Sequence, residues 1–353
     1  MKPLSVELRR VRLDLRNPLA AGHATIAHRT VVLVRVTLPD GTDGWGECAA
    51  LDRPTYSSET TDGAWALLRD ELVPAVLAGR EAAIVGHPMA TAALADARLD
   101  AELRMSGASM ASALGATRTS VAATRVLGIG PSVDDLLARV AAAPAGVKLK
   151  IAPGWDLEPL RAVRAAFPDV WLAADANGGY GVDDLPDLAA VDELDLTYLE
   201  QPLPGLTGAA DAARVLSTPV VLDEPIGDVD TVRGAIALGG LGGFNLKPGK
   251  GGGLRATARA IAVAADEGID VFVGGMLETG VGRAGAVALA ALDACTWPTD
   301  LGPSDWYFPT DLTEPIVAGD DGRLAVPRGP GIGVVPDAAR LDAATVDRLV
   351  LSG

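Results

Sequence analysis

The amino-acid sequence predicts an α/β protein in which a (β/α) barrel is joined to a smaller α+β domain. Three observations lead to this expectation. The 353 residues are too many for one core of average size. From about residue 119, short β-rich runs alternate with Ala-rich amphipathic runs. Lysines and carboxylates then recur along the chain with the period of one βα unit.

The first third of the chain has the pattern of an α+β domain. Apolar and polar residues alternate over 4–15, and a second apolar run covers 31–36. Together with the segment 44–47 (Gly-Trp-Gly-Glu) these runs predict an antiparallel meander. Apolar residues at helical spacing over 65–77 and a stretch at 92–105 predict helices.

The middle of the chain predicts a parallel sheet covered by helices. Seven or eight such units favour a closed barrel over an open sheet. The candidate strands are 121–128, 147–151, 171–175, 197–200, 220–223, 244–247 and 271–274, with a weaker eighth near 299–302. From about Asp311 the chain is rich in Pro and Gly turns, and we expect it to pack back on the first domain. The expected domains are therefore 1–118 plus 311–353, and 119–310.

Composition and charge exclude several classes of protein. Hydrophobic residues make up 49% of the chain and charged residues 22%, which is typical of a folded globular protein. The formal charge of −16 disfavours nucleic acid and anionic membranes as partners. Cys48 and Cys295 form neither a disulfide framework nor a cysteine metal site. The N-terminus lacks the apolar core of a signal peptide, and 284–292 is too short to span a bilayer, so we expect a cytoplasmic protein.

Five charged residues end successive candidate strands in phase. Lys150, Asp175, Glu200, Asp223 and Lys247 are separated by 25, 25, 23 and 24 residues. In a barrel the carboxyl ends of all strands meet at one mouth, where active sites are built. The phase therefore predicts that the five side chains converge.

The residue types indicate a metal-assisted proton abstraction. Three carboxylates without His or Cys suit a hard cation, Mg²⁺ before Ca²⁺ or Zn²⁺, and we expect Mn²⁺ to substitute for Mg²⁺. Lys150 and Lys247 come from strands on either side of the three, and a lysine beside a dication has a lowered pKa, which suits a general base. The metal would hold a substrate carboxylate and neutralise the enediolate that forms when the α-proton leaves.

Each residue alone has a structural explanation. A single Asp at a strand end is more often a helix N-cap than a ligand, and lysines there are usually a solvated edge. The functional interpretation depends on five residues that share one repeat.

Several segments then resemble a known family. Lys148-Leu-Lys150, Asp175-Ala-Asn177, Glu200-Gln-Pro202, Asp223-Glu224 and Asn245-Leu-Lys247 resemble the muconate-lactonizing subgroup of the enolase superfamily. That superfamily is known to pair a lysine or histidine base with Mg²⁺. Further segments resemble its o-succinylbenzoate synthase and N-acylamino acid racemase family, at 44–48, 56–59, 274–283, 304–308, 311–315 and 326–334.

The resemblance implies a modified TIM barrel, (β/α)7β, with an α+β capping domain. It implies Asp175, Glu200 and Asp223 as metal ligands, and Lys150 and Lys247 as the acid/base pair. It assigns Lys148 to supporting Lys150 or the substrate carboxylate, Asn177 to orienting the substrate, and Gly275 and Met276 to lining the pocket. Glu224 and Glu278 are expected behind these residues, and capping loops near 17–28 and 47–57 are expected to close the pocket.

The implied activity is that of an o-succinylbenzoate synthase, a dehydratase of menaquinone biosynthesis. An N-acylamino acid racemase is the second choice, and a dipeptide epimerase is less favoured because 300–305 lacks an Asp-x-Asp motif. A Schiff-base aldolase that uses Lys247, or a non-catalytic binding barrel, are the alternatives from other classes. We expect a small carboxylate substrate and a homo-oligomer.

Some positions depart from the family's pattern. Pro225 stands where Ser is usual, and Lys250 where Arg is common. The first strand carries Thr124, Arg125 and Val126 at positions expected to face the pocket. These changes spare the chemistry and bear on the substrate. His23 and His28 lie in a capping loop, where a histidine is usually exposed. We expect Arg283 to pair with Glu278 or to meet an anion.

Overall fold

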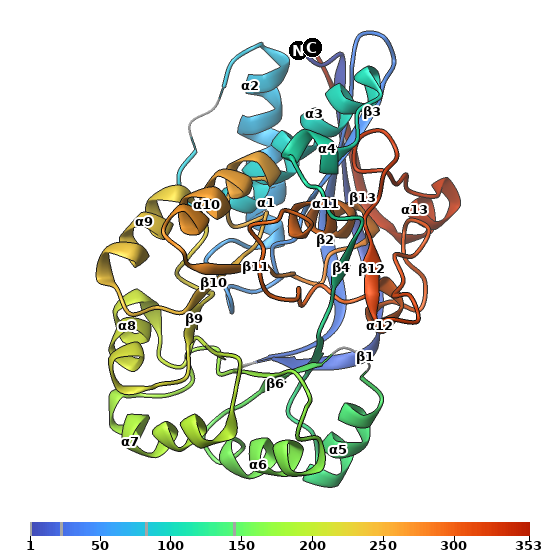
Figure 1. Ribbon diagram of the computed structural model, residues 1–353. Helices are drawn as coiled ribbons and strands as arrows, with labels where there is room; N and C mark the ends of the chain where they lie inside the picture. Colours follow the sequence, from blue (N-terminus) through green and yellow to red (C-terminus); the bar gives the residue numbers. More distant parts are fainter. Residues whose placement is uncertain (1, 22–23, 82–83, 144–145) are drawn as a thin grey trace.

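The computed structural model describes residues 2–21, 24–81, 84–143 and 146–353. It contains a four-stranded antiparallel sheet of order β13-β1-β2-β3 and a seven-stranded parallel sheet of order β11-β10-β9-β8-β7-β6-β5. A two-stranded ladder joins β12 to β4. Figure 1 shows the antiparallel sheet standing beside the curled parallel sheet, which helices surround. The predicted α/β fold, a TIM-like barrel with a cap, is confirmed.

The cap is built on a long antiparallel pair. The alternating run over 4–15 lies almost entirely in one strand, β1 (Ser5–Ala21), which pairs with β2 (Ala24–Thr37), where the second apolar run lies. Val6 lies opposite Val36 and Leu8 opposite Val34, and all four are fully buried. The ladder is irregular between Asp14 and Leu19. The cap sheet is completed by β3 (Asp43–Cys48) and β13 (Thr345–Ser352).

The buried face of this sheet packs on helices. A Cβ at Gly44 would lie 2.2 Å from the backbone N of Ala101, and one at Gly46 would lie 2.0 Å from the carbonyl of Ala93. Only glycine allows the strand to approach the helix so closely. The cap helices are α1 (Thr61–Leu67), the π-helical turn η1 (Leu68–Leu72), α2 (Val73–Leu77), α3 (Pro88–Ser106) and α4 (Met110–Leu114).

The parallel sheet is wrapped on its outer side by helices, as Figure 1 shows. Its strands are β5 (Arg125–Leu127), β6 (Val147–Lys150), β7 (Leu172–Asp175), β8 (Leu199–Glu200), β9 (Val220–Leu222), β10 (Gly243–Leu246) and β11 (Asp270–Val273). The helices are α5 (Val133–Ala141), α6 (Leu157–Ala166), α7 (Leu185–Leu188) with the short turns η2 (Val182–Asp184) and η3 (Ala189–Leu194), α8 (Gly205–Val215), α9 (Val229–Leu238), α10 (Leu254–Asp266) and α11 (Gly280–Ala290).

The prediction of one first strand over 121–128 is wrong. This stretch divides into β4 (Ser120–Ala122), which pairs antiparallel with β12 (Arg323–Ala325), and β5, which joins the parallel sheet. The chain divides because Thr299 inserts beside it: the Thr124 amide donates to the Thr299 carbonyl at 2.8 Å, and the Thr299 amide donates to the Ala122 carbonyl at 2.9 Å.

The weak eighth strand near 299–302 does not form a regular strand, although its segment takes the eighth place. Thr299 forms a parallel bridge with Ala123 on one side. On the other side its hydroxyl donates to the carbonyl of Val273, at the end of β11. The segment thus lies between the last and the first parallel strands. The short helix α12 (Ser304–Tyr307) follows it.

An aromatic cluster fills the interior of the barrel. Tyr198 is fully buried and stacks on Phe272 at 5.3 Å and on Trp297 at 4.9 Å between ring centroids. Trp171 meets the edge of Tyr198 at 5.7 Å. Such aromatic contacts stabilise beyond the area they bury. The cluster lies one inward-facing position below the strand ends, so it forms a rigid floor under them.

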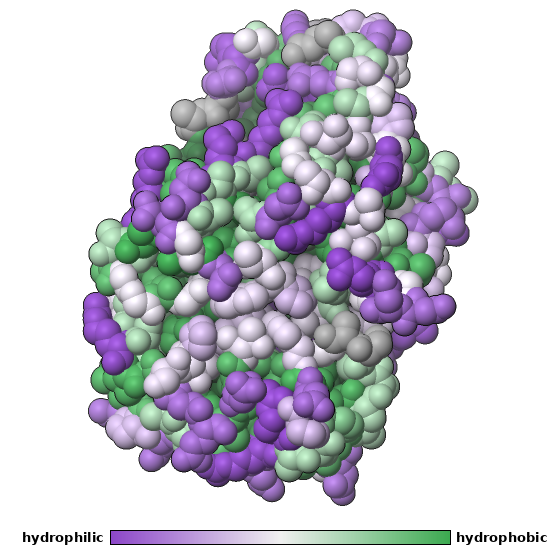
Figure 2. Space-filling model, in the orientation of Figure 1, coloured by the Kyte–Doolittle hydropathy of each residue, from purple (hydrophilic) through white to green (hydrophobic). Residues whose placement is uncertain are grey.

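The end of the chain returns to the cap. Helix α13 (Ala338–Ala344) leads into β13, which pairs with β1 from Ser5 to Val11. The two termini lie together at the top of Figure 1. The division into 1–118 plus 311–353 and 119–310 stays a proposal. Strand β12, from the segment assigned to the cap, pairs with β4, from the segment assigned to the barrel. In the described part of the chain, no helix is long and apolar enough to cross a membrane. Figure 2 shows hydrophilic residues interspersed with hydrophobic ones on the face of the molecule that is seen in the orientation of Figure 1.

Candidate active site

A cavity of about 350 Å³ opens at the carboxyl ends of the parallel strands. Ten of the eleven predicted site residues line it. These are Lys148, Lys150, Asp175, Asn177, Glu200, Asp223, Glu224, Lys247, Gly275 and Met276. The eleventh, Glu278, lies next to it in a smaller cavity between cap and barrel.

Strand alternation places the charged side chains. In β6, Val147 and Leu149 belong to the hydrophobic core, whereas Lys148 and Lys150 line the cavity. Lys150 is in register with Asp175, and Asp175 with Glu200. Just past two of these strand ends the backbone turns with positive φ at non-glycine residues, 47° at Asn177 and 40° at Gln201. Such conformations carry strain and cluster at functional sites.

The two outer lysines each bind a different carboxylate. The Lys150 ammonium lies 2.6 Å from Asp175 Oδ2 and 2.7 Å from Asn177 Oδ1. The Lys247 ammonium lies 2.8 Å from both oxygens of Asp223. The predicted pair therefore flanks the carboxylates from β6 and from β10, on two sides of one cavity.

Lys148 lies deeper and binds a carboxylate that the sequence reasoning missed. Its ammonium donates to Glu200 Oε2 at 2.8 Å and to Asp300 Oδ2. Asp300 comes from the eighth segment and also accepts from the Gly275 amide at 3.1 Å. The sequence feature that could have indicated Asp300 was an acidic residue within the weak eighth strand predicted near 299–302.

The charges of the site set its pKa values. Burial opposes the charge of Asp223, yet the ammonium groups of Lys247 and Lys250 outweigh it and hold the pKa of Asp223 well below its ordinary value. Burial and the charge of Asp175 raise the pKa of Glu200 to about 8 despite Lys148. Burial and Asp223 raise the pKa of Glu224 to about 7.

Lys247 is held as an ammonium ion in this arrangement. Burial alone would lower the pKa of Lys247, but Asp223 and other carboxylates outweigh burial and raise it. A side chain in this state presents a fixed positive charge to the cavity. That suits the stabilisation of a developing anion.

The carboxylates fit a hard cation in kind and in place. Asp175, Glu200 and Asp223 are at most 2% exposed and line one cavity, and Glu224 Oε2 is buried with no hydrogen-bond partner in the described part of the chain. Their mutual repulsion favours a cation between them. In the described residues no three His, Cys, Asp or Glu side chains are already grouped as metal ligands, and lysine ammonium groups lie against these three carboxylates.

The cap contributes one wall of the cavity. Tyr56 donates to Asp223 Oδ1 at 2.5 Å and accepts from Lys247 at 2.7 Å. Leu19, Ile26 and Leu51 add apolar surface. These residues belong to the loops expected to close the pocket, near 17–28 and 47–57. The direct contact of Tyr56 with the charged cluster was not predicted.

The residues singled out for specificity have different surroundings. Lys250 donates to the backbone carbonyls of Asp223 at 2.6 Å and Glu224 at 2.9 Å, and its pKa is lowered to about 8 by burial. The Arg125 guanidinium lies over the ring of Trp306 at 5.2 Å. His28 lies 3.2 Å from Arg12. Neither Arg125 nor His28 lines the cavity, and His23 lies outside the described residues.

Buried polar side chains hold the loop after β11. The Met276 amide donates to Glu278 Oε1 at 2.8 Å, and Leu277 has a φ of 60°. Arg283, expected to pair with Glu278 or to meet an anion, contacts Glu278 through its backbone: it donates to the carbonyl of Glu278 at 2.8 Å and to those of Leu301 and Gly302. The loop thereby gains a fixed position beside the eighth segment.

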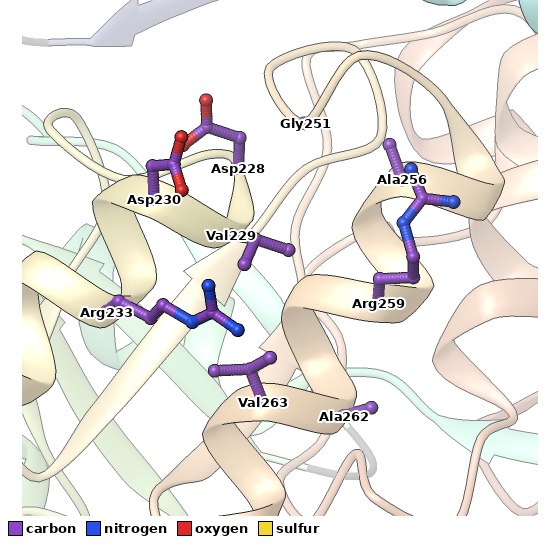
Figure 3. A pocket seen from close by; sticks show the side chains of 9 residues that line it. All are labelled: Asp228, Val229, Asp230, Arg233, Gly251, Ala256, Arg259, Ala262 and Val263. Atoms are coloured by element: carbon purple, nitrogen blue, oxygen red, sulfur yellow. The ribbon is translucent and has the colours of Figure 1, made fainter.

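A second hollow, of about 580 Å³, lies on the outer side of the barrel between α9 and α10 (Figure 3). Figure 3 shows the Arg233 guanidinium between Val229 and Val263, whereas the Arg259 side chain points away from Val263, toward Ala256. None of the eleven predicted site residues lines this hollow. Convergent titratable groups identify the strand-end cavity as the candidate active site.

Comparisons with known proteins agree with this geometry. The family model described as "Enolase C-terminal domain-like" matches residues 132–340. An N-succinylamino acid racemase of Amycolatopsis is 43% identical, over 99% of both chains. An o-succinylbenzoate synthase of Geobacillus kaustophilus is 38% identical, over 96% of this chain and 95% of that protein.

A solved structure of an enolase-superfamily member from Listeria innocua superposes with a TM-score of 0.94 at 32% identity. The match covers 100% of this chain and 99% of the other. The shared architecture, the family model and the relatives over the whole chain agree: the protein belongs to the enolase superfamily and, within it, to the family of o-succinylbenzoate synthases and N-succinylamino acid racemases.

Proposed function

We propose that this enzyme is an o-succinylbenzoate synthase-like dehydratase that removes the proton α to a substrate carboxylate and then expels water. The observation that carries the proposal is the arrangement of two lysines on either side of three buried carboxylates at one cavity. Relatives with this name match over nearly the whole chain.

In the proposed reaction Lys150 is the general base. Its amine takes the α-proton of a cyclohexadiene carboxylate, and the C–H electron pair moves into the carboxylate as an enediolate. The pair then returns to form the ring double bond, the β-hydroxyl leaves, and the proton held on Lys150 completes the water molecule. General acid–base catalysis of this kind contributes about 10²–10⁴-fold to a rate. Asn177, bonded to Lys150, orients the amine.

Lys247 has the electrostatic role in this reaction. Its charge, held by Asp223 and Tyr56, faces the cavity and offsets the negative charge that develops on the substrate. Lys148 keeps Glu200 in place. Aromatisation of the ring supplies the driving force for the loss of water.

We assign Asp175, Glu200 and Asp223 to a Mg²⁺ ion, with Mn²⁺ as the alternative. When bound, the ion would supply a Lewis acid that holds the substrate carboxylate and neutralises the enediolate. Burial, together with the charges of Asp175 and Asp223, raises the pKa of Glu200 to about 8, and the repulsion among these buried carboxylates supports this assignment. So does the known use of magnesium in the superfamily.

The shape of the cavity supports a substrate with an anionic head and an apolar body. Its inner part carries the lysines and carboxylates, while Leu19, Ile26, Leu51, Leu301 and Tyr307 form apolar wall. Gly275 and Met276 complete the lining. The proposal includes a small carboxylate substrate, a cytoplasmic location and a homo-oligomer; light scattering of the purified protein tests the last.

An N-acylamino acid racemase is the second candidate. A relative with the name N-succinylamino acid racemase is 43% identical. A racemase also needs two groups at the α-carbon, one that takes the proton and, on the opposite face, an ammonium that returns one. Lys150 and Lys247 come from strands on either side of the carboxylates and meet that need. The Schiff-base alternative is less favoured, because Asp223 holds Lys247 charged and unreactive as a nucleophile.

One experiment separates the candidates. The purified protein is assayed with the synthase substrate and, in parallel, with the L and D forms of N-succinyl amino acids. A synthase turns over the first, a racemase the second, and a bifunctional enzyme both. Turnover of neither in the presence of Mg²⁺ would defeat the proposal. Covalent trapping of Lys247 by borohydride, with activity intact in EDTA, would favour the aldolase.

A further inference from the structure

Glu200 is held from the layer of side chains below it. Lys148 donates to one carboxylate oxygen at 2.8 Å, and Asn245 Nδ2 donates to the other at 2.9 Å. All three side chains are at most 2% exposed. With one donor on each oxygen, the carboxylate cannot rotate without breaking a buried hydrogen bond.

Asn245 is placed for this contact by its strand. Asn245 lies on β10 and precedes Lys247, the residue that directly follows this strand, by two positions. Both side chains therefore face the inside of the barrel, and Asn245 lies one layer deeper. Its donor bonds Glu200, which is 45 residues earlier in the chain. The position thus joins β10 to β8 across the strand between them.

The other end of the amide is not satisfied. Asn245 Oδ1 is buried and has no partner among the described residues. An unpartnered buried polar atom costs free energy, so Oδ1 gives no reason for an amide at this position. The hydrogen bond from Nδ2 to Glu200 is therefore the contact that explains an amide at this position.

The neighbouring strand end leaves room for this amide. A Cβ at Gly274 would lie 2.1 Å from Asn245 Oδ1 and 2.8 Å from its Cγ. Any side chain at 274 would push Asn245 out of line with Glu200. Gly274 directly precedes Gly275, which lines the cavity. A side chain at either position would crowd its neighbours, which is a steric reason for glycine at both.

We propose that Asn245 is a positioning residue that fixes the carboxylate of Glu200 for the metal ion. This rests on the proposed function, in which Glu200 is a ligand. Each Glu200 oxygen keeps a second lone pair that the amide and Lys148 do not use. A neutral amide orients the carboxylate without adding a second cation that would compete with the metal. Such outer partners commonly govern metal affinity.

The test measures Mn²⁺ binding directly, by the loss of the free-ion EPR signal during titration of the full-length protein. Asn245→Ala removes the donor, and Asn245→Leu removes it while it keeps the volume of the side chain. We expect each to weaken Mn²⁺ binding by about 10–100-fold. The metal concentration for half-maximal turnover should rise by the same factor, while kcat at saturating Mn²⁺ falls less.

Tyr198→Phe is the matched control. Tyr198 belongs to the same inner layer and its hydroxyl has no partner among the described residues, so its removal breaks no bond to Glu200. We expect unchanged Mn²⁺ affinity. Gly274→Ala should act like Asn245→Ala, because it displaces the amide.

The outcomes are distinct from those of the function assay. Wild-type Mn²⁺ affinity in a folded Asn245→Leu or Asn245→Ala protein overturns the inference, even if turnover falls. Equal loss of affinity in Tyr198→Phe also overturns it, since the effect would then be general to the layer. A wild-type protein that binds Mn²⁺ but turns over neither substrate defeats the proposed function and leaves the Asn245 comparison intact.

Discussion

Asp300→Asn is the most informative substitution of the buried charge cluster. Asp300 joins Lys148 to the pocket-lining loop through the Gly275 amide. An asparagine has nearly the same shape but only one acceptor oxygen, so it can serve one of these partners. The variant removes one charge from the cluster without opening a cavity.

The expected cost follows from the remaining contacts of Lys148. Loss of every anionic partner of a buried lysine would cost about 3–5 kcal/mol. Here Glu200 stays at 2.8 Å and Asp175 at 3.7 Å, so only one charged hydrogen bond is lost, worth about 1.5–3 kcal/mol. Asp300 also repels Glu200, and relief of that repulsion offsets part of the loss. We therefore expect the free energy of unfolding to fall by about 1.5 kcal/mol.

Urea unfolding measures this change, with Asp305→Asn as the control. Asp305 lies five residues along the same segment and is exposed, so its charge should be worth little. Because the Gly275 loop also loosens, kcat/KM should fall about 10-fold in Asp300→Asn. Unfolding free energy and kcat/KM that both match the Asp305→Asn control would refute the reasoning.

The other predictions concern Glu47, a buried carboxylate of the cap sheet, and the metal. Burial raises the pKa of Glu47 from 4.5 to about 7, so the folded state binds its proton more tightly than the unfolded state. Its contribution is fully present below about pH 4.5 and is lost as the pH rises through 7, a span worth about 3 kcal/mol. Urea unfolding should thus show a steeper fall between pH 5 and 8 in wild type than in Glu47→Gln, and parallel curves would contradict this. EDTA should lower turnover at least 100-fold with recovery in Mg²⁺. Asp223→Asn should be inactive with or without metal, and full activity of that variant in EDTA would disprove a metal role.

The site was predictable because five charges mark the ends of five regular strands. Lys150, Asp175 and Glu200 end strands of one βα period, and the barrel turns this linear phase into proximity. A pattern of residue types at fixed spacing carries that information without any knowledge of the three-dimensional contacts.

Three contacts of the site could not be predicted from the sequence pattern, and each has a physical reason. Asp300 lies in a segment that forms only a bridge, so no strand period marks it. Asn245 is inside a strand, where an amide is not distinguished from an ordinary buried polar residue. Tyr56 meets Asp223 across 167 residues, from a loop of the cap whose position depends on domain packing.

The first strand was mispredicted for a related reason. Residues 121–127 have continuous β-rich character, but Thr299 competes for the backbone groups of Ala122 and Thr124. Only the tertiary contact decides where β4 ends and β5 begins. Local propensity cannot contain that information.

The central claim is that Lys150 removes the α-proton. The direct test is hydrogen exchange of the substrate in D₂O, followed by NMR, with wild type, Lys150→Ala and Lys247→Ala. With the synthase substrate we expect Lys150→Ala to show neither exchange nor loss of water. Lys247→Ala should be slowed by loss of a stabilising charge. A Lys150→Ala enzyme that incorporates deuterium at the α-carbon at the wild-type rate would contradict the account.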